Sequence, residues 1–273
     1  MSRPIVRRRP ARRLVLALGA SLWAAAVPAA PEDSAPALSP SCGVPMSKLA
    51  ETAPLPHLAA ALRDKRAIEI LAIGSSSTYG VGASRLDHTY PFQLQEILEQ
   101  TFKGHDIFIS NSGMSGELAA ATAERIKTEA MLNRPDLVLW QVGTNDALAG
   151  VPIGEFRTTL RDTIRWLKEH EIDTALIGLQ YSPTLERNLQ HRVIERVIRT
   201  VAAAENVPVV HRYDAMEFLT NSKLEDLLSA DRLHQNDLGY RCMAEHVARV
   251  VVVSAFPHRP DAPKLDQAGP AQP

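Results

Sequence analysis

The sequence has 273 residues, of which 45% are hydrophobic and 22% are charged. This composition suits one globular domain with a sizeable core, and it excludes a disordered or fibrous chain. The two cysteines and the absence of a metal-ligand spacing such as H-E-x-x-H give no indication of a metal centre.

The first 30 residues have the layout of a secretory signal peptide. Six arginines and no acid precede the apolar run LVLALGASLWAAAV, and small residues follow it. We expect cleavage after Ala29 or Ala30, with a retained membrane anchor as the alternative, because the apolar run is short for a membrane span. The protein is then periplasmic or secreted, and it is not stably inserted in the membrane after cleavage.

Removal of this segment changes the charge of the chain. The chain has 30 Lys and Arg residues, of which 24 remain after removal of the segment, and it keeps all 31 Asp and Glu residues. The remaining chain therefore has a net charge of -7. Nucleic acid is therefore excluded as an expected partner, because the basic cluster belongs to the targeting segment.

The rest of the chain divides by composition into three parts. Residues 31–64 form a Pro-rich extension with a short helix near 54–66, residues 65–256 form the main domain, and the Pro-rich residues 257–273 form a disordered tail. Cys42 lies in the extension and Cys242 in the last expected helix, away from its apolar face. In an oxidising compartment they could pair as a surface link, and the alternative is two unrelated thiols.

Apolar runs of strand length alternate with helical patterns along the domain. The strands are expected at 68–74, 106–113, 136–143, 174–182 and 207–213. Helical spacing of apolar residues is found over 92–98, 119–130, 156–167, 189–201 and from residue 237 onward. This alternation predicts an α/β fold with a mostly parallel five-stranded sheet and helices on both faces.

Polar, glycine-bearing segments follow three of these strands. They are IGSSSTYG at 73–80, NSGMSG at 111–116 and GTND at 143–146. Ligands of open parallel sheets bind outside the carboxyl ends of the strands, so these segments are expected to meet there. Near the C-terminus, DRLHQNDLGY at 231–240 places an aspartate three residues before a histidine.

Together these four segments, in this order, resemble the blocks of the SGNH hydrolases, the GDSL-type esterases and lipases. The resemblance implies a three-layer, flavodoxin-like α/β/α fold and a serine hydrolase without cofactor or metal. Ser76 matches the nucleophile, His234 the base and Asp231 the acid. The oxyanion would be held by the backbone N–H groups of Ser76 and Gly116 and by the side-chain amide of Asn145.

The first block departs from the family pattern, because Gly74-Ser75-Ser76 stands where Gly-Asp-Ser is usual. Ser75 and Ser77 therefore remain alternatives for the nucleophile. His191, His211 and His246 are expected to be surface or packed histidines. The Asp87-His88 pair is not expected to act together, because adjacent loop residues do not reliably face one another.

The substrate is predicted from the loops. Apart from residues 78–90 the connections are short, so we expect no lid that would enclose a fatty chain. An exported enzyme of this kind is expected to hydrolyse short acyl esters, acetyl above all, on a glycoside or polysaccharide. A lysophospholipase or thioesterase is the alternative, followed by an acyltransferase or a glycan-binding protein without activity.

Overall fold

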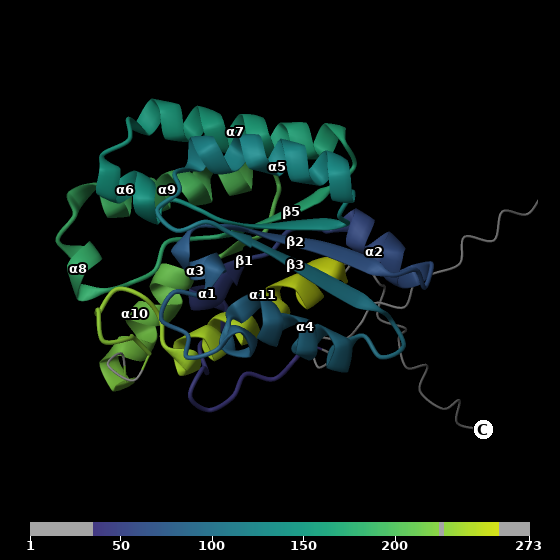
Figure 1. Cartoon of the computed structure of the whole chain (residues 1–273), viewed down its shortest axis with the longest axis horizontal. Helices are drawn as coiled ribbons and strands as arrows, with labels where there is room; N and C mark the ends of the chain where they lie inside the picture. Colours follow the sequence, from purple (N-terminus) through teal and green to yellow (C-terminus); the bar gives the residue numbers. More distant parts are fainter. Residues whose placement is uncertain (1–34, 224–226, 257–273) are drawn as a thin grey trace, which may run out of the picture.

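The computed structural model describes residues 35–223 and 227–256, so the expected signal peptide and the whole predicted C-terminal tail, 257–273, lie outside the described residues (Figure 1). The described chain forms a six-stranded sheet in the order β1-β6-β5-β4-β2-β3. The strands are β1 (Ala50–Glu51), β2 (Ile68–Gly74), β3 (Ile107–Gly113), β4 (Leu137–Gln141), β5 (Asp173–Ile177) and β6 (Val209–Val210).

The strands from β2 to β6 are parallel, and their order is that of a flavodoxin-like sheet. All residues of β4 and β5 are buried, as expected for strands covered on both faces. The prediction of a mostly parallel α/β fold is confirmed.

The predicted number of five strands is too low. β1 was missed because two residues carry no periodicity, and it pairs antiparallel with β6 through Ala50 and Val210. The strand predicted at 207–213 is reduced to Val209–Val210. The N–H of His211 donates to the carbonyl of Leu49, and a helix begins at the next residue.

Helices cover both faces of the sheet (Figure 1). On one face lie α5 (Ala119–Asn133), α7 (Ile153–Glu169) and α9 (Leu189–Ala204); on the other lie α2 (Pro56–Arg63), α4 (Tyr90–Thr101) and α11 (Asp237–Ala255). The shorter helices are α1 (Met46–Leu49), α3 (Ser76–Tyr79), α6 (Thr144–Ala149) and α8 (Pro183–Glu186), with α10 (Arg212–Lys223) and a 3-10 turn at Leu86–His88. The three-layer prediction is therefore confirmed.

The segment before residue 65 shares the core of the domain. Leu49, Leu55 and Leu58 are fully buried against α4 and α11. Among the described helices, none has both the length and the apolar character that a bilayer crossing requires.

A disulfide joins Cys42 to Cys242 of α11 across 200 positions of sequence. The expectation of a surface link is wrong, because both cysteines are buried and pack with Leu219 and Leu227. The helical wheel placed Cys242 off the apolar face of α11, but the chain around Cys42 covers that side of the helix.

Reduction of this disulfide is expected to lower the melting temperature. The bond closes a loop of 200 residues, which corresponds to at most about 5 kcal/mol in the chain-entropy account. Thermal unfolding with and without reductant, and of the C42S/C242S double variant, measures the effect. Protein from an oxidising compartment with both thiols free, shown by an intact mass two hydrogens heavier, would contradict the pairing.

Candidate active site

The first candidate residue, Ser76, lies at the tight turn between β2 and α3. A side chain at Gly74 would come within 2.6 Å of the carbonyl oxygen of Gln141, so only glycine fits there. A side chain at Gly113, at the end of β3, would meet the backbone nitrogen of Tyr79 at 2.0 Å. The turn therefore packs directly against the ends of β3 and β4, and Ser76 lies at the carboxyl edge of the sheet.

The flanking serines are engaged elsewhere. Both the N–H and the hydroxyl of Ser75 donate to Oε1 of Gln141 at 2.9 Å, and the hydroxyl of Ser77 donates to Oε1 of Gln180 at 3.0 Å. Both serines are buried, whereas Ser76 is partly exposed. The geometry therefore favours Ser76 over the two alternatives that the sequence left open.

Ser76, His234 and Asp231 form a continuous hydrogen-bonded chain. Nε2 of His234 lies 2.9 Å from Oγ of Ser76, and Nδ1 lies 2.6 Å from Oδ2 of Asp231. The second carboxylate oxygen of Asp231 accepts bonds from the hydroxyl of Ser229 and from the backbone N–H groups of Leu233 and His234. This is the arrangement of a nucleophile, a base and an orienting acid.

The carboxyl of Asp231 is held in its charged form. Its partial burial acts to raise the pKa, but the His234 hydrogen bond, the two backbone donors and Ser229 outweigh it and hold the pKa well below its usual range. Asp231 therefore stays ionised at neutral pH, where a carboxylate can steady an imidazolium.

The three candidate oxyanion donors follow the ends of neighbouring strands: Ser76 begins α3 after β2, Gly116 lies in the loop after β3, and Asn145 lies in α6 after β4. Gly116 has φ 82°, in the left-handed region that favours glycine, and it is exposed. Nδ2 of Asn145 donates to the carbonyl of Glu117 at 2.9 Å, which ties α6 to the Gly116 loop. An amide nitrogen carries two hydrogens, so this bond leaves the second N–H of Asn145 for a ligand.

Supporting residues at this edge were missed by the sequence reasoning. Oδ1 of Asp146 accepts the N–H of Ala119 at 3.0 Å, at the start of α5, and Gln141 holds Ser75. Burial raises the pKa of Asp146, and its backbone hydrogen bonds oppose that effect. Asp146 lies in the GTND segment, so that motif could have identified it as a supporting residue. Gln141 belongs to no motif that could have identified it.

The other histidines that the sequence analysis considered do not join this site. His191, His211 and His246 are buried, and His88 bonds to Asp237 rather than to Asp87. Within residues 35–223 and 227–256, no group of three or more His, Cys, Asp or Glu side chains is placed to hold a metal ion.

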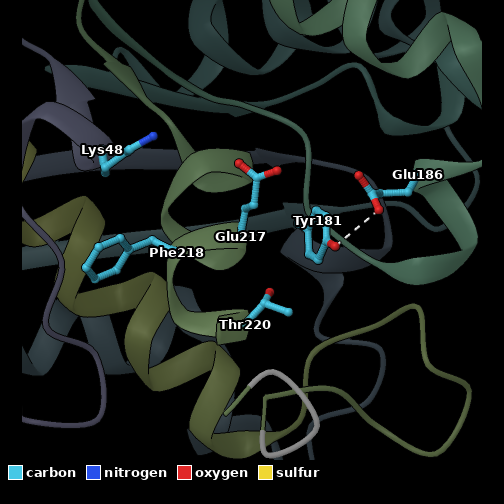
Figure 2. A pocket seen from close by; sticks show the side chains of 6 residues that line it. All are labelled: Lys48, Tyr181, Glu186, Glu217, Phe218 and Thr220. Carbon is cyan, nitrogen blue, oxygen red and sulfur yellow. Dashed lines mark hydrogen bonds between the residues drawn. The ribbon is translucent and has the colours of Figure 1, made fainter. Parts of the chain in front are cut away.

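A cavity of about 540 Å³ lies beside the segment that follows β5. Figure 2 shows Tyr181 and Glu186 on one side of it, hydrogen-bonded at 3.2 Å, and Glu217 pointing into the space between Tyr181 and Lys48. Phe218 and Thr220 of α10 complete the lining. Tyr181 directly follows Gln180, whose side chain bonds Ser77 and the carbonyl of Leu233. The segment that lines the cavity is thereby linked to the Ser76 turn and the His234 loop, while the lining itself contains none of Ser76, Asp231 and His234.

Residues 41–256 match the non-GDSL lipase-like family. The chain belongs to this family. It is thus an SGNH-type esterase, a lipolytic hydrolase related to the GDSL enzymes, as the sequence motifs predicted. Esterase TesA of Pseudomonas aeruginosa is 24% identical to it over 144 residues, which are 52% of this chain and 68% of that esterase.

Solved structures share the fold of this family member. One is a two-domain esterase active on acetylated mannans, with a TM-score of 0.66 and 19% identity; the match covers 85% of this chain and 60% of that one. Another is a variant of Axe2, an acetyl xylan esterase from Geobacillus stearothermophilus, with a TM-score of 0.59 and 21% identity over 68% of this chain and 96% of that one. The present chain thus spans well under two thirds of the first of these proteins.

Ser76→Ala is expected to abolish ester hydrolysis and covalent labelling by a fluorophosphonate, because no other described serine hydroxyl bonds Nε2 of His234. Labelling followed by intact mass and a melting curve tests this. A folded variant that is still fully labelled would move the nucleophile to Ser75 or Ser77.

Asn145→Ala is expected to lower kcat by ~10²–10³-fold, because a lost oxyanion donor acts on the transition state, while KM stays within a few-fold. The matched control is Asn188→Ala, since Nδ2 of Asn188 also donates to a backbone carbonyl, that of Ala147 in the same helix α6. The control should lose stability and keep its turnover. If the Asn145→Ala and Asn188→Ala variants have the same turnover, Asn145 has only a structural role.

Proposed function

We propose that the protein hydrolyses short-chain esters, acetyl above all, carried on a carbohydrate. The observation that carries this proposal is the lining of the cavity at Tyr181, the residue after Gln180, whose side chain links the Ser76 turn to the His234 loop. Carboxylates of Glu186 and Glu217 and the hydroxyls of Tyr181 and Thr220 supply hydrogen-bonding groups for sugar hydroxyls, and the rings of Tyr181 and Phe218 supply flat apolar faces. A fatty chain would gain little in such a cavity, since burial of apolar carbon against charged groups desolvates the charges.

The reaction follows from the hydrogen-bonded chain. His234 takes the proton of Ser76 as its oxygen bonds to the acyl carbon, and Asp231 steadies the resulting imidazolium. The negative charge on the former carbonyl oxygen is held by the N–H groups of Ser76 and Gly116 and the amide of Asn145. His234 returns the proton to the departing alcohol, and a water molecule activated by the same histidine then releases the acid and restores Ser76.

The sugar supplies the departing alcohol in this scheme. It would occupy the cavity next to Tyr181, with the acyl group toward Gly116. The esterases on acetylated mannan and acetyl xylan that share the fold support this choice. The mature protein is proposed to act in the periplasm or outside the cell, which agrees with the signal-like residues 1–30 and with a buried disulfide.

A lysophospholipase or thioesterase activity is the second candidate. Tyr79 and Met114 favour it, because both apolar side chains are more than half exposed beside the Ser76 turn and could contact a longer acyl chain. The relationship to Esterase TesA is compatible with either substrate class.

A series of p-nitrophenyl esters from acetate to palmitate, together with acetylated xylan, mannan and glucosamine, separates the candidates. We expect kcat/KM to fall at least ~10-fold from acetate to the long chains, because the cavity offers no apolar tunnel. Glu217→Ala and Phe218→Ala should lower kcat/KM on the acetylated glycan and leave p-nitrophenyl acetate unaffected. Phe108→Ala removes an equally exposed ring from the start of β3 and serves as the control. Preference for palmitate would reject the carbohydrate assignment.

A further inference from the structure

Arg212, the first residue of α10, lies fully inside the protein behind the triad. Only 2% of its surface is accessible, and no carboxylate in the described parts of the chain forms an ion pair with it. Its Nε and Nη1 atoms are buried without a hydrogen-bond partner, so the guanidinium is held through Nη2 alone. Burial lowers the pKa of Arg212 to about 10, which leaves it protonated at neutral pH.

The single nitrogen Nη2 reaches three acceptors from distant parts of the sequence. They are the hydroxyl of Ser77 at 3.0 Å, Oε1 of Gln180 at 2.8 Å and Oε1 of Gln235 at 3.0 Å. Each acceptor is itself about 98% buried. These bonds run from a charged donor between buried side chains, where hydrogen bonds are stronger than at the surface.

The acceptors are the sequence neighbours of the reacting groups. Ser77 follows Ser76, and Gln235 follows His234. Gln180 extends the network, because its Nε2 donates at 2.7 Å to the carbonyl of Leu233, on the other side of His234. The guanidinium therefore bonds directly to the residue after Ser76 and to the residue after His234, and it is linked through Gln180 to the residue before His234.

The packing around Gln235 fixes the orientation of its side-chain amide. Nε2 of Gln235 donates to the carbonyl of Gly239 at 3.1 Å, and a side chain at Gly239 would come within 2.9 Å of Cβ of Gln235. The amide is thereby oriented with its oxygen toward Arg212. Ser77 likewise turns its hydroxyl hydrogen to Gln180 and leaves its lone pairs for the arginine.

We propose that Arg212 is a positioning residue that sets the distance between Ser76 and His234, an inference that rests on the triad under Proposed function. A guanidinium buried without a counterion is costly for stability, and an apolar side chain of similar volume is often neutral or better. The planar, rigid guanidinium instead fixes the positions of the groups it bonds to. Small displacements of reacting groups lower the reaction rate by large factors.

The test compares Arg212→Met and Arg212→Lys with the wild type, using p-nitrophenyl acetate, a fluorophosphonate and a melting curve. Arg212→Met is expected to lower kcat by ~10–100-fold with KM within about threefold, and to slow labelling by a similar factor, because the attack of Ser76 is itself impaired. Arg212→Lys should recover part of the loss, since an ammonium can serve some of the three acceptors.

The control is Arg199→Met, which removes an arginine paired with Glu195 and Asp214 and without a contact to the Ser76 or His234 loops. It should lose stability and keep its turnover. If Arg212→Met does not fold, Gln235→Leu replaces it and is expected to lose turnover in the same way. Wild-type turnover in folded Arg212→Met, or in Gln235→Leu, overturns the inference. A wild type that neither hydrolyses nor reacts with the fluorophosphonate rejects the proposed function itself.

Discussion

The active site depends on how closely the ends of β2, β3 and β4 approach one another. Gly74 pairs with Gly113 in the β2–β3 register, and neither position has room for a side chain. This approach brings the first turn of α3 onto β3 and places Ser75 within hydrogen-bond distance of Gln141 at the end of β4. Ser76, the candidate nucleophile, is consequently fixed by backbone packing, and the loops that carry the other candidate groups extend to this point.

The sequence could predict those parts that rest on local patterns. The parallel strands, the main helices and the four motif segments follow from apolar periodicity and from polar residues at strand ends. The contact between Asp231 and His234 could also be predicted, since an aspartate three residues before a histidine can reach Nδ1 of its ring within one turn. Strand β1 has too few residues for a periodic signal, and α10 follows β6 so closely that its beginning reads as strand, which made the predicted strand at 207–213 too long.

The supporting network could not be predicted, because its members lie far apart in the chain and share no spacing. Ser77, Gln180, Arg212 and Gln235 are ordinary polar residues in the sequence, and only burial makes their hydrogen bonds decisive. The same holds for Cys242: the helical wheel describes α11 alone, whereas the buried position arises from the segment around Cys42 that packs over it.

The two halves of the proposed site have different structural origins. Ser76 lies at the sheet edge and the residues next to Ser76 and His234 bond to Arg212, whereas the cavity proposed for the alcohol is lined by Lys48 of α1, by Tyr181 and Glu186 and by residues of α10. The segment that carries Lys48 is held by the disulfide at Cys42 and by the pairing of β1 with β6. Changes in that segment can therefore alter which alcohol is accepted without moving Ser76 or His234. The division separates the chemistry, which needs rigid backbone packing, from the proposed recognition, which depends on side chains of α10, of the segment after β5 and, through Lys48, of the segment added to the edge of the sheet.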